Sequence, residues 1–239
     1  MDSAEEINRL IAHSNTGATH LENDDFTNAL WSFREALHAS KLLVNRSSTR
    51  RNEAPSERFV RLDHFMVDDC APGDWGDVDA FFYRHALQVP VSLSSSMIKD
   101  SRTTAMLSAI VIFNLALFHH RASMDATLRN YQGHDAVGLL RKAVRLYESL
   151  FPLLQRGDIE DGSTLFILHT LNNLGQAYRA LDEIDNAEQC FRQVLSTLMY
   201  ISTSDKDYLC GASSSSLECF FFSTSYLIFP HCAQAASAA

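Results

Sequence analysis

The segment from Leu168 to Ser202 constrains the fold of this chain more than any other part of the sequence. Apolar residues recur there at helical spacing, stop at Asp182-Glu183, and then resume at helical spacing. The first set is Leu168, Leu171, Leu174, Tyr178 and Leu181, and the second is Ile184, Ala187, Phe191, Val194, Leu195 and Leu198. Gly175 and Ala187 stand where the two helices would cross, and larger side chains there would force the helices apart. The sequence therefore predicts two helices packed as a hairpin.

This hairpin resembles a tetratricopeptide repeat (TPR), a unit of about 34 residues with an ordered set of large and small positions. The residues that carry the resemblance are Leu171, Leu174, Gly175 and Tyr178 in the first helix and Ala187 and Phe191 in the second. Val194 departs from the pattern, since a small residue is usual at its position. The run from Leu171 to Gly175 is similar to kinesin-light-chain-like repeats, and the layout of the chain resembles TPR-like proteins of microalgae. The resemblance implies a mainly α fold, a superhelix of TPR-like α-α hairpins.

Two weaker copies of the pattern precede this hairpin. In the first copy, from Leu10 to Leu42, Gly17 takes the place of Gly175, and Ala29 follows at the interval that separates Gly175 from Ala187. The other matches in this copy are Phe33 and Ala36, while His13 and His20 stand where large residues are usual. The second copy matches at Leu115, Ala116, His119, Ala136, Leu140 and Ala143, with extra residues between its halves. We therefore expect a single domain, 1–239, with repeat one at about 4–43 and repeats two and three at about 101–204.

The segment 44–100 and the tail 205–239 do not fit the repeat pattern. Phe59–Met66 and Phe81–Val89 are rich in aromatic and β-branched residues, and a loop with Pro and Gly separates them, which predicts an inserted β-hairpin. In the tail, Leu217–Phe229 is strongly apolar. An exposed strand of that kind would aggregate. We therefore expect an apolar C-terminal strand that pairs with the hairpin or covers the last helix.

One asparagine recurs two residues before the small position in all three copies, as Asn15, Asn114 and Asn173. An amide side chain offers both a donor and an acceptor, so it can pair with a peptide unit. The resemblance to TPR domains that bind extended peptides implies that these asparagines face a concave groove and bond the peptide backbone. The alternative is that they stabilise packing between repeats. The candidate groove residues are Asn15, Asn114, Asn173, Phe113, Leu117, His120, Asn172, Gln176 and Arg179.

A second kind of TPR ligand, the C-terminal carboxylate of a chaperone tail, does not fit this sequence. TPR domains of that kind hold the carboxylate with lysines and an arginine. The matching positions here are Ser14 and Ala18 in repeat one and His169 and Asn173 in repeat three. Without those cations the groove cannot form strong charge-assisted hydrogen bonds to a carboxylate.

The charge of the chain favours a protein partner. Its 239 residues carry a net charge of −9, which argues against nucleic-acid binding and against docking on an anionic membrane. The N-terminus has no secretory signal, and the longest apolar run, Ala105–Phe118, is shorter than a membrane span. We therefore expect a cytoplasmic scaffold or adaptor that binds a peptide or protein partner, with no catalytic residue, cofactor or metal.

The alternative is a small enzyme or a metal- or ligand-binding protein. Its site would lie between the β-hairpin and the helices, near His64, Asp68 and His85. The sequence has no phosphate-binding glycine loop, nucleophile elbow or H-E-x-x-H motif. His119 and His120 are adjacent, and neighbouring side chains on a helix diverge by about 100°, too far to chelate one metal well. These observations weaken the alternative without excluding it.

Overall fold

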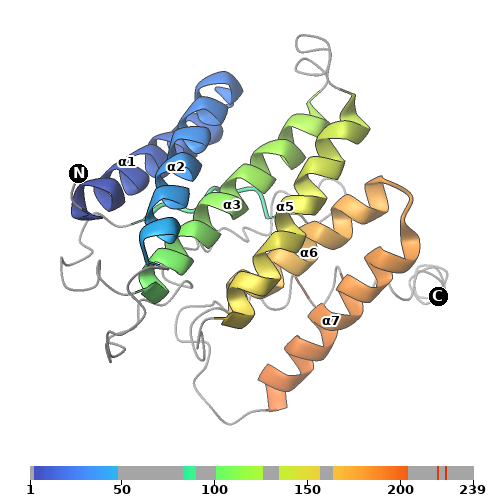
Figure 1. The fold of residues 1–239 in the computed structure, drawn as a ribbon. Helices are drawn as coiled ribbons and strands as arrows, with labels where there is room; N and C mark the ends of the chain where they lie inside the picture. The colour runs from blue at the N-terminus through green and yellow to red at the C-terminus, as the bar shows by residue number, and fades with distance from the viewer. Residues whose placement is uncertain are drawn as a thin grey trace, which may run out of the picture. The chain divides into compact units, whose positions relative to one another are not determined.

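The computed structural model describes residues 3–47, 83–89, 101–125, 135–156 and 164–203, together with Phe220 and Thr224. Six helices lie in this part of the chain (Figure 1). Residue contacts divide the chain into unit 1, which comprises Met1–Met66 and Arg84–Gly162, and unit 2, which comprises Val67–Tyr83 and Ser163–Ala239. The described fold is mainly α, as the sequence predicts. The expectation of a single domain, 1–239, stays a prediction.

The first helical hairpin belongs to unit 1 and consists of α1 (Ser3–Glu22) and α2 (Phe26–Ser47). The two helices come close because Gly17 on α1 has no side chain. A Cβ atom built on Gly17 would lie 2.6 Å from Cδ1 of Phe33 on α2, which is closer than real Cβ contacts. Ala29 and Ala36 on α2 are fully buried, so α2 also contributes small residues to the crossing. This geometry confirms the pairing of Gly17 with the Ala29–Phe33 positions of the repeat pattern.

The turn between α1 and α2 is formed by aspartates. Asp24 has a φ of 56°, which is the left-handed region that asparagine and aspartate tolerate better than most residues. The Asp25 carboxylate then accepts hydrogen bonds from the side-chain Nδ2 of Asn28 at 2.7 Å and from its backbone N–H at 3.3 Å. These hydrogen bonds lower the pKa of Asp25 and cap the start of α2.

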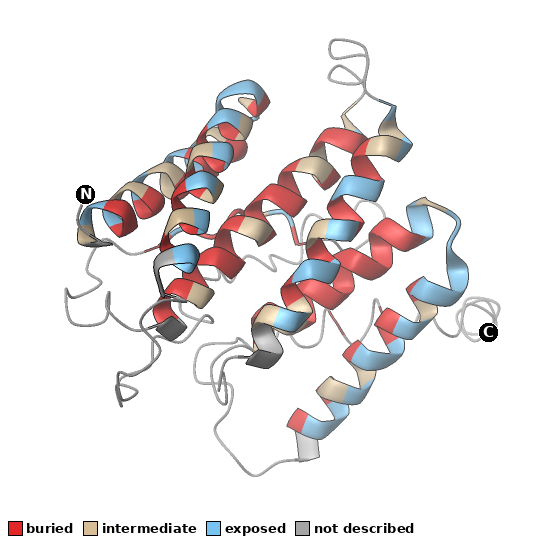
Figure 2. Cartoon of the chain, viewed as in Figure 1, coloured by how far each residue is buried: buried red, intermediate tan, exposed pale blue. Residues whose placement is uncertain are grey.

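Unit 1 continues with α3 (Ser101–Met124) and α5 (Ala136–Arg156). Helix α3 contacts α1, α2 and α5, and it is red along most of its length in Figure 2. The stretch Thr103–Met124 is long and apolar enough to cross a membrane by length and composition, and 83% of its most apolar window is buried inside the protein. A helix that is apolar on nearly all sides is typical of a protein core. Residues 125–135, which connect α3 to α5, account for much of the extra length predicted in this copy.

Unit 2 contains the second well-defined hairpin, α6 (Thr164–Ala180) and α7 (Ile184–Thr203). A Cβ atom on Gly175 would lie 2.7 Å from Cε1 of Phe191, which repeats the relation of Gly17 to Phe33. Asp182 has a φ of 62°, which repeats the conformation of Asp24. The sequence separation is the same from Gly17 to Gly175, from Phe33 to Phe191 and from Asp24 to Asp182. The hairpin predicted over Leu168–Ser202 is therefore confirmed, and repeats one and three share the same turn and crossing.

The predicted β-hairpin and C-terminal strand are not supported. Tyr83–Val89 lies outside any helix or strand, and its backbone groups bond to side chains on helices rather than to a neighbouring strand. Phe59–Met66 lies outside the described residues. In the tail, Phe220 and Thr224 are both helical, and the Thr224 hydroxyl donates a hydrogen bond to the Phe220 carbonyl.

Candidate functional site

The candidate site is built around residues Tyr83–Val89, which lie outside any helix or strand. Tyr83, Ala86, Leu87 and Val89 are buried, His85 is half-buried, and Arg84 and Gln88 are exposed. Residues 84–89 belong to unit 1 and Tyr83 belongs to unit 2, so the two parts are described separately. We call residues 84–89 the tethered segment.

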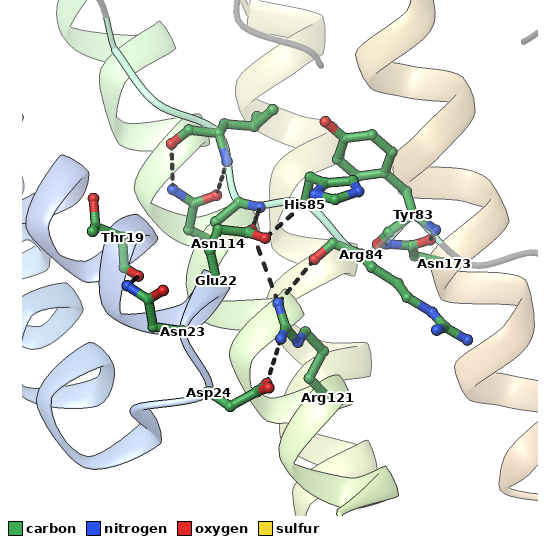
Figure 3. Close-up of polar contacts among 12 residues, drawn as sticks. Thr19, Glu22, Asn23, Asp24, Tyr83, Arg84, His85, Asn114, Arg121 and Asn173 are labelled. Carbon is green, nitrogen blue, oxygen red and sulfur yellow. Dashed lines mark hydrogen bonds and ion pairs between the residues drawn. The ribbon is translucent and has the colours of Figure 1, made fainter. Parts of the chain in front are cut away.

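Two asparagines of unit 1 hold the backbone of the tethered segment. Oδ1 of Asn114 accepts a hydrogen bond from the Leu87 N–H at 2.8 Å, and Nδ2 of Asn114 donates to the Leu87 carbonyl at 2.8 Å (Figure 3). Asn15 makes the same pair of hydrogen bonds with Val89, both at 2.7 Å. Each amide therefore satisfies both polar groups of one residue, as a neighbouring strand does in a hydrogen-bonded pair of an antiparallel sheet.

Glu22 on α1 holds the tethered segment one residue before Leu87. Its Oε1 accepts a hydrogen bond from the Ala86 N–H at 2.7 Å, and its Oε2 lies 3.3 Å from Nδ1 of His85. Burial alone would raise the pKa of Glu22, but the hydrogen bonds from His85 and Ala86, together with the nearby charge of Arg121, lower the pKa below its usual 4.5. The carboxylate is therefore ionised at neutral pH and can accept from both groups.

Arg121 on α3 completes the polar contacts. Its Nη1 donates to the Arg84 carbonyl at 3.2 Å and lies 3.9 Å from Oε1 of Glu22. Its Nη2 bonds Oδ1 of Asp24 at 2.7 Å, as Figure 3 shows. Only 16% of the Arg121 side chain is exposed. The guanidinium thus connects the tethered segment to the turn that follows α1.

The side chains that hold the tethered segment come in two pairs, one on α1 and one on α3, and both pairs have the same spacing along the helix. Glu22 lies about two turns beyond Asn15 on α1, and Arg121 lies about two turns beyond Asn114 on α3. Residues at that spacing share one face of a helix, and α1 contacts α3. Each helix therefore presents an amide and a charged group to the segment. We call Asn15, Glu22, Asn114 and Arg121 the segment-binding site.

In unit 2, Asn173 on α6 holds Tyr83 in the same way. Oδ1 of Asn173 accepts from the Tyr83 N–H at 2.9 Å, and Nδ2 donates to the Tyr83 carbonyl at 3.0 Å. The Tyr83 ring lies 4.1 Å from the His169 ring, and the His169 ring lies 4.6 Å from Phe220, measured between centroids. Backbone and side chain of Tyr83 are thus both fixed against α6.

The three recurring asparagines therefore bind peptide backbone, and the backbone belongs to this chain. Their role toward a partner stays a prediction. Of the other predicted groove residues, Phe113, Leu117, His120, Asn172 and Gln176 are buried and Arg179 is exposed. Phe113 and His120 both meet the ring of Tyr147 on α5, with centroids 5.9 and 6.2 Å apart. These two side chains belong to the core of unit 1.

Sequence reasoning missed Glu22 and Arg121. A signal for Glu22 was present, because a carboxylate in the last turn of a helix opposes the helix dipole and needs a compensating partner. Arg121 gave no such signal, because a cation in the last turn of a helix is favoured by the helix dipole and needs no further partner.

The predicted alternative site, near His64, Asp68 and His85, is not assembled in the described part of the chain. His64 and Asp68 lie outside the described residues, and His85 contacts Glu22. Within the described residues, no group of three or more His, Cys, Asp or Glu side chains could hold a metal ion.

Residues 167–198 match the family model of the tetratricopeptide repeat, and the match covers most of α6 and most of α7. No curated protein matches the chain, and no solved structure matches it.

Proposed function

Because the chain is a TPR-like helical repeat protein, we propose that it is a non-catalytic scaffold that binds an extended segment of a partner protein. Repeats of this family generally mediate protein–protein interactions. The partner would lie on the helix faces that carry the recurring asparagines.

The observation that carries the proposal is the pairing of Asn15, Asn114 and Asn173 with peptide backbone. Each amide bonds both the N–H and the carbonyl of a single residue, at distances between 2.7 and 3.0 Å. A hydrogen bond of this kind contributes about 1 kcal/mol net. The two pairs in unit 1, made by Asn15 and Asn114, support binding of a peptide backbone whatever its side chains are, and Asn173 repeats the same pairing within unit 2.

Specificity would come from the side chains that alternate along the peptide. In the tethered segment, Leu87 and Val89 are buried and Gln88 between them is exposed. Recognition of an extended strand commonly divides in this way, with backbone hydrogen bonds for affinity and pockets for alternate side chains.

The test is a selection of binders from a random peptide library displayed on phage, followed by titration of the selected peptides. The titrations use proteins that carry Leu87→Asp, because a charge at this buried position should free Asn114 from the tethered segment. They compare Leu87→Asp alone with versions that add Asn114→Ala or, as a matched control, Asn23→Ala. Asn23 is an exposed asparagine whose side chain bonds the Thr19 carbonyl, four residues earlier in the chain, at 2.9 Å. The proposal expects peptides that bind Leu87→Asp with and without Asn23→Ala but lose affinity when Asn114→Ala is added. Selected peptides that bind all three proteins equally would contradict it.

A further inference from the structure

The tethered segment contacts the segment-binding site as a bound peptide ligand would, through hydrogen bonds from side chains to its backbone. Its backbone is bonded at Arg84, Ala86, Leu87 and Val89, in every case by a side chain of the segment-binding site. None of these contacts is a helix or sheet hydrogen bond. A partner segment of the same conformation could therefore make the same contacts.

We propose that the segment-binding site receives a partner segment with a defined pattern, and that residues 84–89 are a tethered competitor that the partner displaces. The pattern is a histidine or basic residue, then a small residue, leucine, any residue, and a small β-branched residue. The proposal rests on the proposed function, since it specifies the ligand and the regulation of the same site.

The pattern follows from the burial of each position. Leu87 is fully buried and Val89 is 1% exposed, so these positions accept apolar side chains of limited size. Ala86 is 4% exposed, so a larger residue would have to displace its neighbours. Gln88 is exposed, and its position leaves the choice of residue open.

At the position of His85, before the small residue Ala86, the charge of Glu22 determines which residue types are favoured. His85 lies 3.3 Å from the carboxylate of Glu22, which is ionised at neutral pH because its pKa is lowered. A histidine or a cation is attracted at this position, whereas an acidic residue would be repelled by Glu22. Arg121, at 3.9 Å from Glu22, offsets part of this charge and also holds the backbone carbonyl of the preceding residue.

Displacement leaves the helices in place. Side chains alone hold the backbone of residues 84–89, so release of these residues breaks no hydrogen bond within α1 or α3. Tyr83, the preceding residue, keeps its two hydrogen bonds to Asn173. A ligand that belongs to the same chain acts at a high effective concentration. A partner must exceed that competition, so the affinity measured for wild type is lower than the affinity of the open site.

The main experiment measures binding of a fluorescein-labelled synthetic peptide that spans residues 82–91, by fluorescence anisotropy. Leu87→Asp places a charge in the buried position and should release the tethered segment. Gln88→Asp is the matched control, because it adds the same charge at the exposed neighbouring position. We expect the peptide to bind Leu87→Asp at least about tenfold more tightly than wild type, since an open state populated at ~1–10% lowers the apparent affinity by the same factor. Gln88→Asp should bind like wild type, and adding Asn114→Ala to Leu87→Asp should abolish binding.

A second measurement uses the unmodified protein, in case Leu87→Asp does not fold. An excess of the unlabelled peptide should accelerate hydrogen exchange at residues 84–89 while α3 stays protected. A peptide with aspartate in place of its leucine should have no effect. Exchange of residues 84–89 that proceeds only together with α3, and that no peptide changes, would overturn the proposal and identify the segment as permanent core.

The outcomes separate this proposal from the proposed function. Peptides selected from the library that need Asn114 but leave residues 84–89 protected would preserve the scaffold function and overturn displacement. Absence of peptide binding to wild type and to every variant would overturn both. Dimers of Leu87→Asp with wild-type protein, formed without added peptide, would identify the occupant as a second copy of this chain and overturn the assignment to a partner.

Discussion

Asn114 on α3 and Leu87 in the tethered segment exchange two hydrogen bonds, each 2.8 Å long, between a side-chain amide and a complete peptide unit. Both residues are fully buried. The two residues are 27 positions apart in the sequence, and no local sequence pattern predicts their contact. The Asn114 amide makes the two hydrogen bonds to Leu87 that a neighbouring β-strand would otherwise make. This relationship is the observation behind the proposal that the recurring asparagines bind the backbone of a partner peptide.

Replacing Asn114 with alanine should destabilise unit 1. The substitution leaves the buried N–H and carbonyl of Leu87 without their partner, and each unsatisfied buried group costs about 1–3 kcal/mol. We expect a loss of about 2–4 kcal/mol in the free energy of unfolding by urea. Asn23→Ala removes an exposed amide and should change stability by less than about 0.5 kcal/mol. Equal stabilities for the two variants would show that the Asn114 pair does not hold the segment.

Gly17→Ala and Gly175→Ala should each destabilise the protein by about 1–3 kcal/mol, because the added methyl group overlaps a phenylalanine ring. The ring atoms would lie 2.6 Å from the new Cβ at Gly17 and 2.7 Å from it at Gly175. Phe33→Leu should partly rescue Gly17→Ala, which a double-mutant cycle would measure.

Gly138 on α5 is the control for these glycines, because a Cβ atom there would meet nothing within 4 Å. Alanine favours a helix over glycine by about 1 kcal/mol, so Gly138→Ala should stabilise the protein. Destabilisation by Gly138→Ala of the same size as by Gly17→Ala would mean that the crossing contacts are not the cause.

Acid should release the tethered segment through Glu22. The pKa of Glu22 is lowered below 4.5 in the folded protein, so its stabilising effect is complete above about pH 4.5 and is lost as the pH falls through the folded pKa. Hydrogen exchange of residues 84–89 should therefore accelerate below about pH 4.5, relative to α3, after correction for intrinsic rates. Glu22→Gln keeps an acceptor for the Ala86 N–H and should lack this pH dependence. The same acceleration in Glu22→Gln would assign the effect to another group.

His120 should cause a separate loss of stability at higher pH. Burial lowers the pKa of His120 from 6.5 to about 3, so the folded protein holds it neutral while the unfolded chain binds a proton below pH 6.5. Stability is therefore complete above pH 6.5 and falls by up to about 1.4 kcal/mol per pH unit as the pH drops toward the folded pKa. Urea unfolding of His120→Gln between pH 7 and pH 5 should show a shallower dependence than wild type. Identical slopes for the two proteins would contradict the assignment to His120.

The helical hairpins were predictable because their signals are local. The interval from Gly175 to Ala187, the break at Asp182 and the apolar spacing all lie within one hairpin, and α6 and α7 follow them closely. The recurring asparagines were also visible in sequence, as were the chemical properties that suit them to peptide backbone.

The tethered segment was only partly predictable. The aromatic and β-branched content of Phe81–Val89 predicted a strand of a β-hairpin, whereas residues 83–89 lie outside any helix or strand. Such content does not say what pairs with the backbone, and a neighbouring strand was the conventional choice. The actual partners are side chains on α1, α3 and α6, distant in sequence, which no periodicity within residues 83–89 encodes.

The measurement that tests the central claim most directly is calorimetric titration of one library-selected peptide into three proteins that all carry Leu87→Asp. The first carries Leu87→Asp alone, and the other two add Asn114→Ala or Asn23→Ala. Leu87→Asp is needed because the tethered segment uses the same Asn114 hydrogen bonds as the partner, so its competition would offset the effect of Asn114→Ala. The claim is that the recurring asparagines bind the backbone of an extended partner. Loss of two backbone hydrogen bonds, each about 1 kcal/mol net, should weaken binding to the Asn114→Ala protein by about tenfold or more. The Asn23→Ala protein should bind within about twofold of Leu87→Asp alone. Equal affinity for all three proteins, with each confirmed to be folded, would contradict the claim.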